Sequence, residues 1–278
     1  MWSEPLLWIL KAPLNHLSFW LRQRLHWQRG LPPLPDEPKE GLFADFPARE
    51  RQAAELLEQN LRHHFALENL YQHSSQHDYR DNLYLIEALR QLCADVVLPE
   101  QLHALDVGCK NFHYAPGLYQ FLCHWQGPRQ VELTGIELDG YGIYADGFSR
   151  ADYGHAWAQQ ADPTHVHFRV ADVLALKGSS FELITCFYPF MTAAALLNWG
   201  LPLRCFQPQA LLAHCWELLT PGGRLILFHQ TAQEANIAQQ YLGTETLCRA
   251  LPLDLNLVTY YPQTRDRHMR LWQKPTKK

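Results

Sequence analysis

From residue 102 onward, short apolar runs alternate with stretches in which apolar residues recur at helical spacing. Brief connections separate the two kinds of segment, a pattern typical of parallel strands joined by crossover helices. It predicts strands at 102–107, 131–137, 166–170, 181–187 and 223–229. We therefore expect an α/β domain built on a doubly wound, mostly parallel sheet.

Two further strand-like runs close the chain, at 254–261 and 267–273. Their close spacing leaves room for a turn but not for a crossover helix, so we expect an antiparallel hairpin. The hairpin completes a predicted sheet of seven strands.

The first 29 residues are rich in tryptophan and leucine, with basic residues interspersed. Leu14, Leu17, Leu21 and Leu25 fall at helical spacing, and Pro13 suits the first turn of a helix but would end an earlier one. Two short amphipathic pieces are expected. They fit packing against the rest of the protein or a partner chain, which we favour, and they also fit peripheral attachment to a membrane.

Prolines crowd the segment 30–41, which predicts a stiff, extended linker after these pieces. Apolar periodicity then predicts one helix over 53–65 and a second over 85–93, with Asp78 or Asp81 as its N-cap. We divide the chain into a tryptophan-rich extension with its linker (1–41), a helical cap (42–97) and the sheet domain (98–278).

Three of the predicted strands end in or just before a carboxylate. Asp106 stands in an Asp-Val-Gly turn after the first strand, Glu137 ends the second, and Asp172 follows the third. In a parallel sheet these positions lie along one edge, where ligands bind beyond the strand ends and glycine lets the backbone approach them. The spacing indicates a crevice for an adenosine-like ligand, although each carboxylate could instead cap the following helix.

Composition narrows the function classes. The chain has 278 residues, 47% of them apolar, and a net charge of −4, which disfavours nucleic acid as a partner. The seven cysteines lack close paired spacing and predict reduced residues of a cytoplasmic protein. His73 and His77 stand at i, i+4 without the partners of a metal site, so no metal is expected. No apolar run reaches the roughly 20 residues of a membrane span.

The ordered segments from about Leu102 to Gln273 resemble those of the class I S-adenosylmethionine-dependent methyltransferases. The turn and strand that begin at Pro221-Gly222-Gly223 match that family closely, and the terminal hairpin fits it as well. The resemblance implies S-adenosylmethionine as cofactor. The residues that it implies for cofactor binding are Asp106, Gly108, Cys109, Lys110, Glu137, Leu138, Asp172, Val173 and Phe187.

One loop departs from the family pattern, which has three glycines at alternate positions. Here only Gly108 remains, and Lys110 and Phe112 stand in the other two places. A side chain at positive φ costs about 1–3 kcal/mol, so we expect the loop to take a modified path, with Asn111 supplying the turn. Lys110 could approach the cofactor's carboxylate or be an exposed turn lysine.

Methyl transfer from a sulfonium needs mainly alignment of acceptor, methyl and sulfur, so few catalytic residues are expected. Tyr188, in the loop after the fourth strand, is the candidate to orient or deprotonate the acceptor. His229 is a second candidate base. The resemblance also makes the N-terminal helices a cover for the cofactor, with Tyr71, His77 and Tyr79 as candidate lid residues.

The sequence thus favours methyl transfer to a small molecule. The degenerate loop leaves open a catalytically silent protein of the same fold that acts through residues 1–29 at a partner or membrane surface. A nucleotide-dependent dehydrogenase ranks third, because its full glycine fingerprint is missing.

Overall fold

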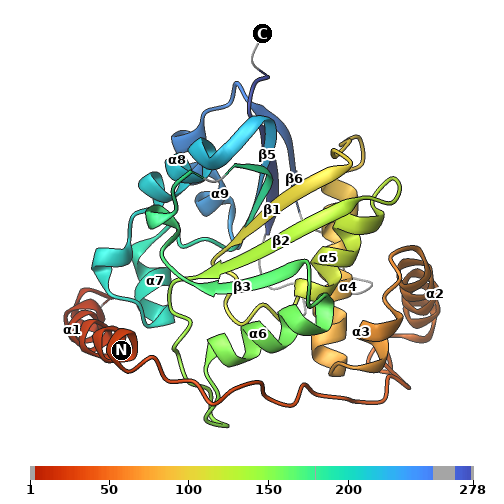
Figure 1. Ribbon diagram of the computed structural model, residues 1–278, viewed down its shortest axis with the longest axis horizontal. Coiled ribbons are helices and arrows are strands. Elements are labelled where there is room, and N and C mark those ends of the chain that lie inside the picture. The colour runs from red at the N-terminus through yellow and green to blue at the C-terminus, as the bar shows by residue number, and fades with distance from the viewer. Residues whose placement is uncertain (1–3, 179, 253–266, 277–278) are drawn as a thin grey trace.

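The computed structural model describes residues 4–178, 180–252 and 267–276 (Figure 1). Within them, seven strands form one sheet in the order β3-β2-β1-β4-β5-β7-β6. The strands are β1 (Gln101–Val107), β2 (Gln130–Glu137), β3 (Val166–Val170), β4 (Phe181–Phe187), β5 (Leu219–His229), β6 (Leu247–Pro252) and β7 (His268–Gln273). The first five are parallel, and β7 runs antiparallel to both β5 and β6. The predicted fold class is confirmed.

All five predicted parallel strands are present, and only β5 begins several residues earlier than predicted. The last predicted strand, at 267–273, is also present as β7. Its described antiparallel neighbour β6 lies at Leu247–Pro252, a strand that the apolar pattern did not predict. The predicted strand at 254–261 lies outside the described residues.

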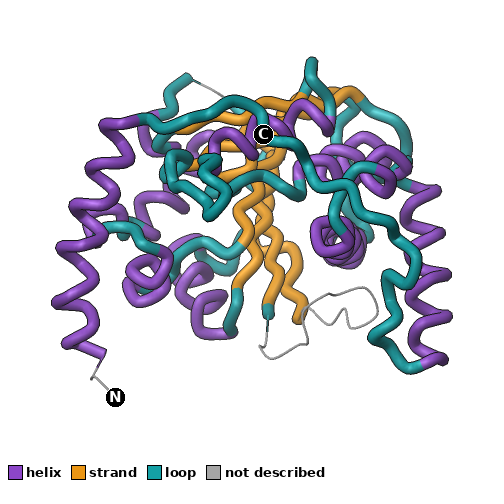
Figure 2. Tube along the Cα trace, turned by 90° about the horizontal axis from the view of Figure 1, so that it is seen from below, coloured by secondary structure: helices purple, strands orange, loops and turns teal. Residues whose placement is uncertain are grey.

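Helices cover both faces of the sheet, which Figure 2 shows nearly edge-on. One face carries α4 (Gln76–Leu92), α5 (Ala115–His124) and α6 (Arg150–Ala161). The other face carries α8 (Pro208–Leu218) and α9 (Ala232–Leu242). Helices α2 (Ala48–His64) and α3 (Glu68–Gln72) lie on the outer side of α4. Helix α7 (Ala193–Trp199) follows β4 in the chain. Short 3₁₀ turns lie at Val173–Ala175 and Leu203–Cys205.

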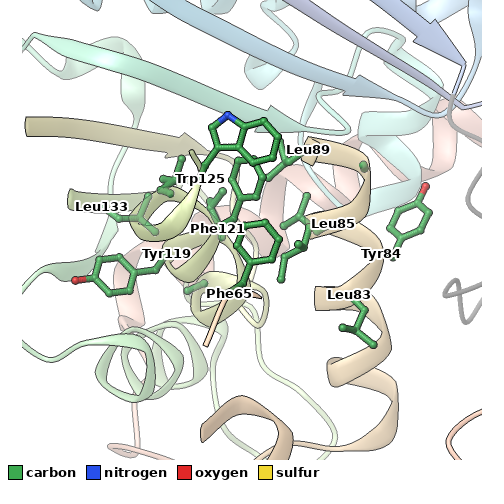
Figure 3. Close-up of a cluster of buried hydrophobic side chains, with 14 of the residues drawn as sticks. Phe65, Leu83, Tyr84, Leu85, Leu89, Tyr119, Phe121, Trp125 and Leu133 are labelled. Atoms are coloured by element: carbon green, nitrogen blue, oxygen red, sulfur yellow. The ribbon is translucent and has the colours of Figure 1, made fainter. Parts of the chain in front are cut away.

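A large hydrophobic core joins the N-terminal helices to the sheet. Phe65, at the end of α2, packs against Phe121 of α5, whose ring stacks on Trp125 (Figure 3). Leu85 and Leu89 present the inner face of α4 to the same cluster. The N-cap of α4 is Ser75, which accepts the Asp78 N–H, so the predicted Asp78 and Asp81 caps are wrong. Helix α4 begins at Gln76, before the apolar residues from which the helix at 85–93 was predicted, because its first turns are polar and follow the Ser75 cap.

The N-terminal extension forms one helix, α1 (Glu4–Leu25), with Pro13 inside it. The prediction of two pieces is therefore wrong. An internal proline removes one hydrogen bond and costs about 3 kcal/mol, but contacts on both sides of Pro13 hold α1 together. Lys11 donates to Asn198 at 2.7 Å, and the Asn15 amide donates to the carbonyl groups of Leu197 and Leu201. The helix therefore packs beside α7 (Figure 1).

Candidate active site

A cavity of about 770 Å³ lies beyond the carboxyl ends of the parallel strands. Val107, Glu137, Phe187 and Phe228 bring the ends of β1, β2, β4 and β5 to its wall. Phe19 of α1 also lines it. Its volume falls within the range of small-molecule and cofactor sites. The sequence-predicted residues on the wall are Gly108, Lys110, Glu137, Leu138, Asp172, Val173, Phe187 and Tyr188.

Glu137 is the buried carboxylate of this wall. One carboxylate oxygen accepts the Lys110 N–H at 2.8 Å and the other accepts the Asp139 N–H at 2.9 Å. Burial raises the pKa of Glu137 above its ordinary value, and these backbone bonds together with Arg150 oppose the shift. Both oxygens are thereby fixed in place, and each keeps a lone pair for a ligand hydroxyl group.

Asp106 does not reach the cavity wall, contrary to the predicted rim of three carboxylates. It is fully buried behind the wall, where it accepts hydrogen bonds from the Tyr114 hydroxyl and the Thr185 hydroxyl, each at 2.6 Å. Burial raises the pKa of Asp106 to about 7. Cys109 is also fully buried and away from the wall. The rim consists of Glu137 and Asp172, and Asp106 positions Tyr114, which does line the cavity.

The loop after β1 has positive φ at all three positions of the family's glycine pattern, although only the first of them is glycine here. Gly108, Lys110 and Phe112 have φ values of 74°, 56° and 58°, while Asn111 is not in the left-handed region. The predicted modified path and the predicted role of Asn111 are therefore wrong. The Phe112 ring is fully buried, and it lies so close to Gly135 of β2 that a Cβ there would come within 2.8 Å of it. Burying this ring offsets the backbone strain.

Lys110 lines the cavity without filling it. Its ammonium lies 5.7 Å from the centre of the Trp199 ring, and burial lowers the pKa of Lys110, with Arg150 adding to the effect. Near it, Asp139 is held by Arg22 of α1 and by Arg150, each at 2.8 Å. The N-terminal helix is thus fastened beside the end of β2.

Tyr188 lies on the cavity wall, with φ at 62°. Burial raises the pKa of Tyr188 well above its ordinary value, with Tyr84 adding to the effect, so the phenol stays protonated at neutral pH. It can donate a hydrogen bond but is a poor base. His229 is fully buried and away from the wall, and burial, aided by Arg270 and His268, lowers its pKa to about 3. We do not retain His229 as a catalytic residue.

None of the candidate lid residues, which lie on α3 and α4, lines the cavity. Tyr79 is fully buried and donates to Glu58 at 2.6 Å, Tyr71 packs against Tyr79, and His77 is away from the cavity wall. Instead Asp81, Tyr84 and Leu85 of α4 line the cavity. Their i, i+3, i+4 spacing places them on one face of α4, and this spacing is visible in the sequence.

Two more wall residues, His113 and Arg267, were not predicted. The His113 ring contacts Asp81 and Asn111, both at 3.2 Å. No cluster of three potential metal ligands occurs in the described part of the chain. Likewise, no described helix is long and apolar enough to cross a bilayer.

No protein-family model and no curated protein sequence matches this chain. Among solved structures, the [4+2]-cyclase SpnF is 12% identical, with a TM-score of 0.50 over 90% of this chain and 100% of SpnF. A putative class I S-adenosylmethionine-dependent methyltransferase of Listeria monocytogenes is 11% identical over 85% of this chain and 78% of its own, with a TM-score of 0.49. TrmN from Thermus thermophilus is 18% identical over 69% of this chain, with a TM-score of 0.48, and the chain spans about half of TrmN (48%). At these identities the likenesses concern the fold alone, and this chain shares the fold of SpnF. Its mixed seven-stranded sheet with a C-terminal antiparallel pair fits the fold class that the sequence resemblance implied.

Proposed function

We propose that this protein transfers a methyl group from S-adenosylmethionine to a small molecule. The observation that carries the proposal is the buried, backbone-held Glu137 carboxylate at the end of β2, facing a cavity of about 770 Å³. Glu137 would bind the ribose hydroxyl groups, and Leu138, Asp172 and Val173 would border the adenine ring. Gly108 and Lys110 would receive the methionine part, where the Lys110 ammonium suits a carboxylate.

The cofactor supplies a methyl group that is already activated on sulfur, so the protein needs to align the acceptor rather than generate a strong nucleophile. Tyr188 would orient the acceptor through its protonated hydroxyl group. Phe187 and Phe228, whose ring centres lie 4.8 Å apart, provide an apolar wall near the end of β4. Phe19 and Leu85 border the cavity from α1 and α4, a setting that suits a small acceptor.

We expect Glu137→Gln to weaken S-adenosylmethionine binding by 10-fold to 100-fold. The variant loses charge-assisted hydrogen bonds to the ribose, worth about 1.5–3 kcal/mol. Isothermal titration calorimetry measures the affinity, and thermal unfolding of the same samples reports whether the loop is intact. Glu132→Gln is the matched control, since Glu132 is a partly exposed carboxylate on the same strand, paired with His165. Equal affinity in Glu137→Gln and the parent protein would show that the ribose assignment is wrong.

A specific observation favours a second candidate function, attachment to a lipid surface. Leu14, Leu17, Leu21 and Leu25 form a stripe on α1 with exposures of 66%, 55%, 42% and 71%. The opposite side of α1 is occupied by contacts to the sheet domain. Arg24 lies over the half-exposed Trp20 beside this stripe, and residues 1–29 contain four Lys or Arg against one acidic residue. Apolar, aromatic and basic residues in this order suit the interface of an anionic bilayer.

The double variant Leu17→Glu, Leu21→Glu tests this attachment. Both side chains are exposed, so the fold is expected to persist while two apolar anchors become charged. In sedimentation with vesicles of equal phosphatidylglycerol and phosphatidylcholine, we expect the partition coefficient to fall at least tenfold. Leu56→Glu, at a leucine of α2 that is 60% exposed, is expected to match the parent protein. The same partition for all three proteins would exclude lipid attachment through this face.

A further inference from the structure

Arg267 brings a positive charge to the far end of the cavity. It directly precedes β7, whose first residue, His268, pairs with His229 at the carboxyl end of β5. The side chain is half-buried and lies on the cavity wall. Its position is therefore set by the sheet rather than by a surface loop alone.

The Arg267 guanidinium contacts two phenols and no described carboxylate. Nη1 donates to the Tyr84 hydroxyl at 2.8 Å and to the Tyr188 hydroxyl at 3.5 Å. Among the described residues, no hydrogen bond engages Nε or Nη2. These two groups form one edge of the planar guanidinium, the edge that binds a carboxylate with two parallel hydrogen bonds.

Two other half-buried arginines near the cavity form ion pairs with a carboxylate. Arg22 and Arg150 share Asp139, at 2.8 Å each. Asp81 lies on the same wall, where it contacts His113 at 3.2 Å and His77 at 3.8 Å. A half-buried charge without a counterion among the described residues favours binding of an anion, since burial of an unpaired charge is costly.

The order of the strands separates this charge from the proposed cofactor site. Glu137 ends β2, and Arg267 precedes β7, so β1, β4 and β5 lie between the two strands. Four strand spacings of about 4.8 Å put them about 19 Å apart. Arg267 therefore lies on the acceptor side, beyond Tyr188 and Phe228, and not beside the ribose.

We infer that the methyl acceptor is a small aromatic carboxylic acid whose carboxylate binds the Nε–Nη2 edge of Arg267, an inference that rests on the proposed function. One guanidinium balances the single charge of a carboxylate, whereas a phosphate monoester carries about −1.5 to −2. Phe187, Phe228 and Tyr188 line the same end and suit an aromatic ring. Tyr84 and Tyr188 hold the guanidinium in orientation through Nη1, so Arg267 is a specificity-determining residue.

Matched pairs of ligands test this inference. Benzoate and 3-phenylpropanoate are each compared with their neutral amides in calorimetric titrations of protein saturated with S-adenosylhomocysteine. For at least one pair, we expect the acid to bind at least tenfold more tightly than the amide. Arg267→Met should abolish this preference and leave the affinity for S-adenosylhomocysteine unchanged. Arg267→Lys, which keeps the charge but not the planar edge, should retain only part of it.

Arg204→Met is the control for a general effect of positive charge, because Arg204 also lines the cavity but lies over the ring of Phe19. It should keep the preference for the acid. The inference is overturned if neither acid is preferred, if Arg267→Met keeps the preference, or if phenyl phosphate binds more tightly than both acids. If S-adenosylhomocysteine fails to bind but Arg267 still selects the acids, the methyltransferase proposal fails while the carboxylate site stands.

Discussion

Replacing Phe112 with glycine is expected to destabilise the protein less than replacing it with alanine. Loss of the fully buried ring should cost about 3–5 kcal/mol in the alanine variant. Phe112 has a φ of 58°, where any residue with a Cβ is strained by about 1–2 kcal/mol and glycine is not. We therefore expect the glycine variant to be about 1 kcal/mol more stable than the alanine variant, as measured by urea unfolding.

Phe121 provides the control for this order. It is a buried phenylalanine within α5, where the backbone is helical and glycine costs about 1 kcal/mol more than alanine. Phe121→Gly should therefore be less stable than Phe121→Ala. If the two positions gave the same order, the left-handed backbone at Phe112 would be contradicted.

The Phe112 position also shows why the sequence alone did not predict this loop. Lys110 and Phe112 were expected to avoid positive φ, since local steric cost argues against it. That expectation did not include the stabilisation gained by burying the Phe112 ring, which offsets the steric cost. The ring packs against Gly135, which is 23 residues away on the neighbouring strand. Only the tertiary structure shows that a strained residue is held by its own burial.

Replacing His229 with leucine is expected to make the protein more resistant to acid. Burial, with Arg270 and His268 adding to it, lowers the pKa of His229 to about 3, and neither ring nitrogen has a hydrogen-bond partner among the described residues. In the unfolded chain the imidazole takes up a proton near pH 6.5, whereas in the folded protein it stays neutral to about pH 3. The unfolded state then binds more protons, so this histidine lowers stability as the pH falls from about 6.5 toward 3.

The full shift corresponds to a loss on the order of 4 kcal/mol at the acid end of this range. We expect His229→Leu to reduce that loss in urea unfolding measured from pH 8 to pH 4. The difference between variant and parent is the informative quantity, because Asp106, whose pKa is raised to about 7, acts in the opposite direction in both proteins. His165→Gln should not increase acid resistance, since a hydrogen bond to Glu132 raises the pKa of that exposed histidine. Parallel curves for parent and His229→Leu would show that the buried neutral state is wrong.

The strands β1, β2, β4 and β5 could be predicted because each has a run that is largely buried on both faces and therefore apolar, whereas the edge strand β3 shows alternating apolar residues. The positions of Glu137 and Asp172 on the cavity wall followed from the same runs, since the strand ends lie along one edge. Asp106 obeys the same rule but has turned inward to Tyr114 and Thr185, partners that no spacing reveals. The sequence pattern predicts where a strand ends, but it does not predict the direction in which the last side chains of that strand point.

Arg267 shows a second limit of prediction from sequence, which is that contacts between distant segments are not visible in it. Nothing in its neighbourhood along the chain distinguishes it from a surface arginine, and it meets Tyr84 only because β7 returns antiparallel beside β5. The pairing spans 183 residues. Residues of this kind are found through topology, after the order of the strands is known.

The placement of α1 has a consequence for regulation. One side of this helix supplies Phe19 to the cavity and Arg22 to Asp139, while the other side exposes Leu17 and Leu21. An element shared in this way can connect events on its two sides. If binding of a partner or membrane to the exposed side displaced α1, it would change the affinity of the cavity for its ligand. Thermodynamic reciprocity would then require the ligand to change the affinity of α1 for that partner or membrane by the same factor. The helix would then act as an allosteric connection between location and catalysis.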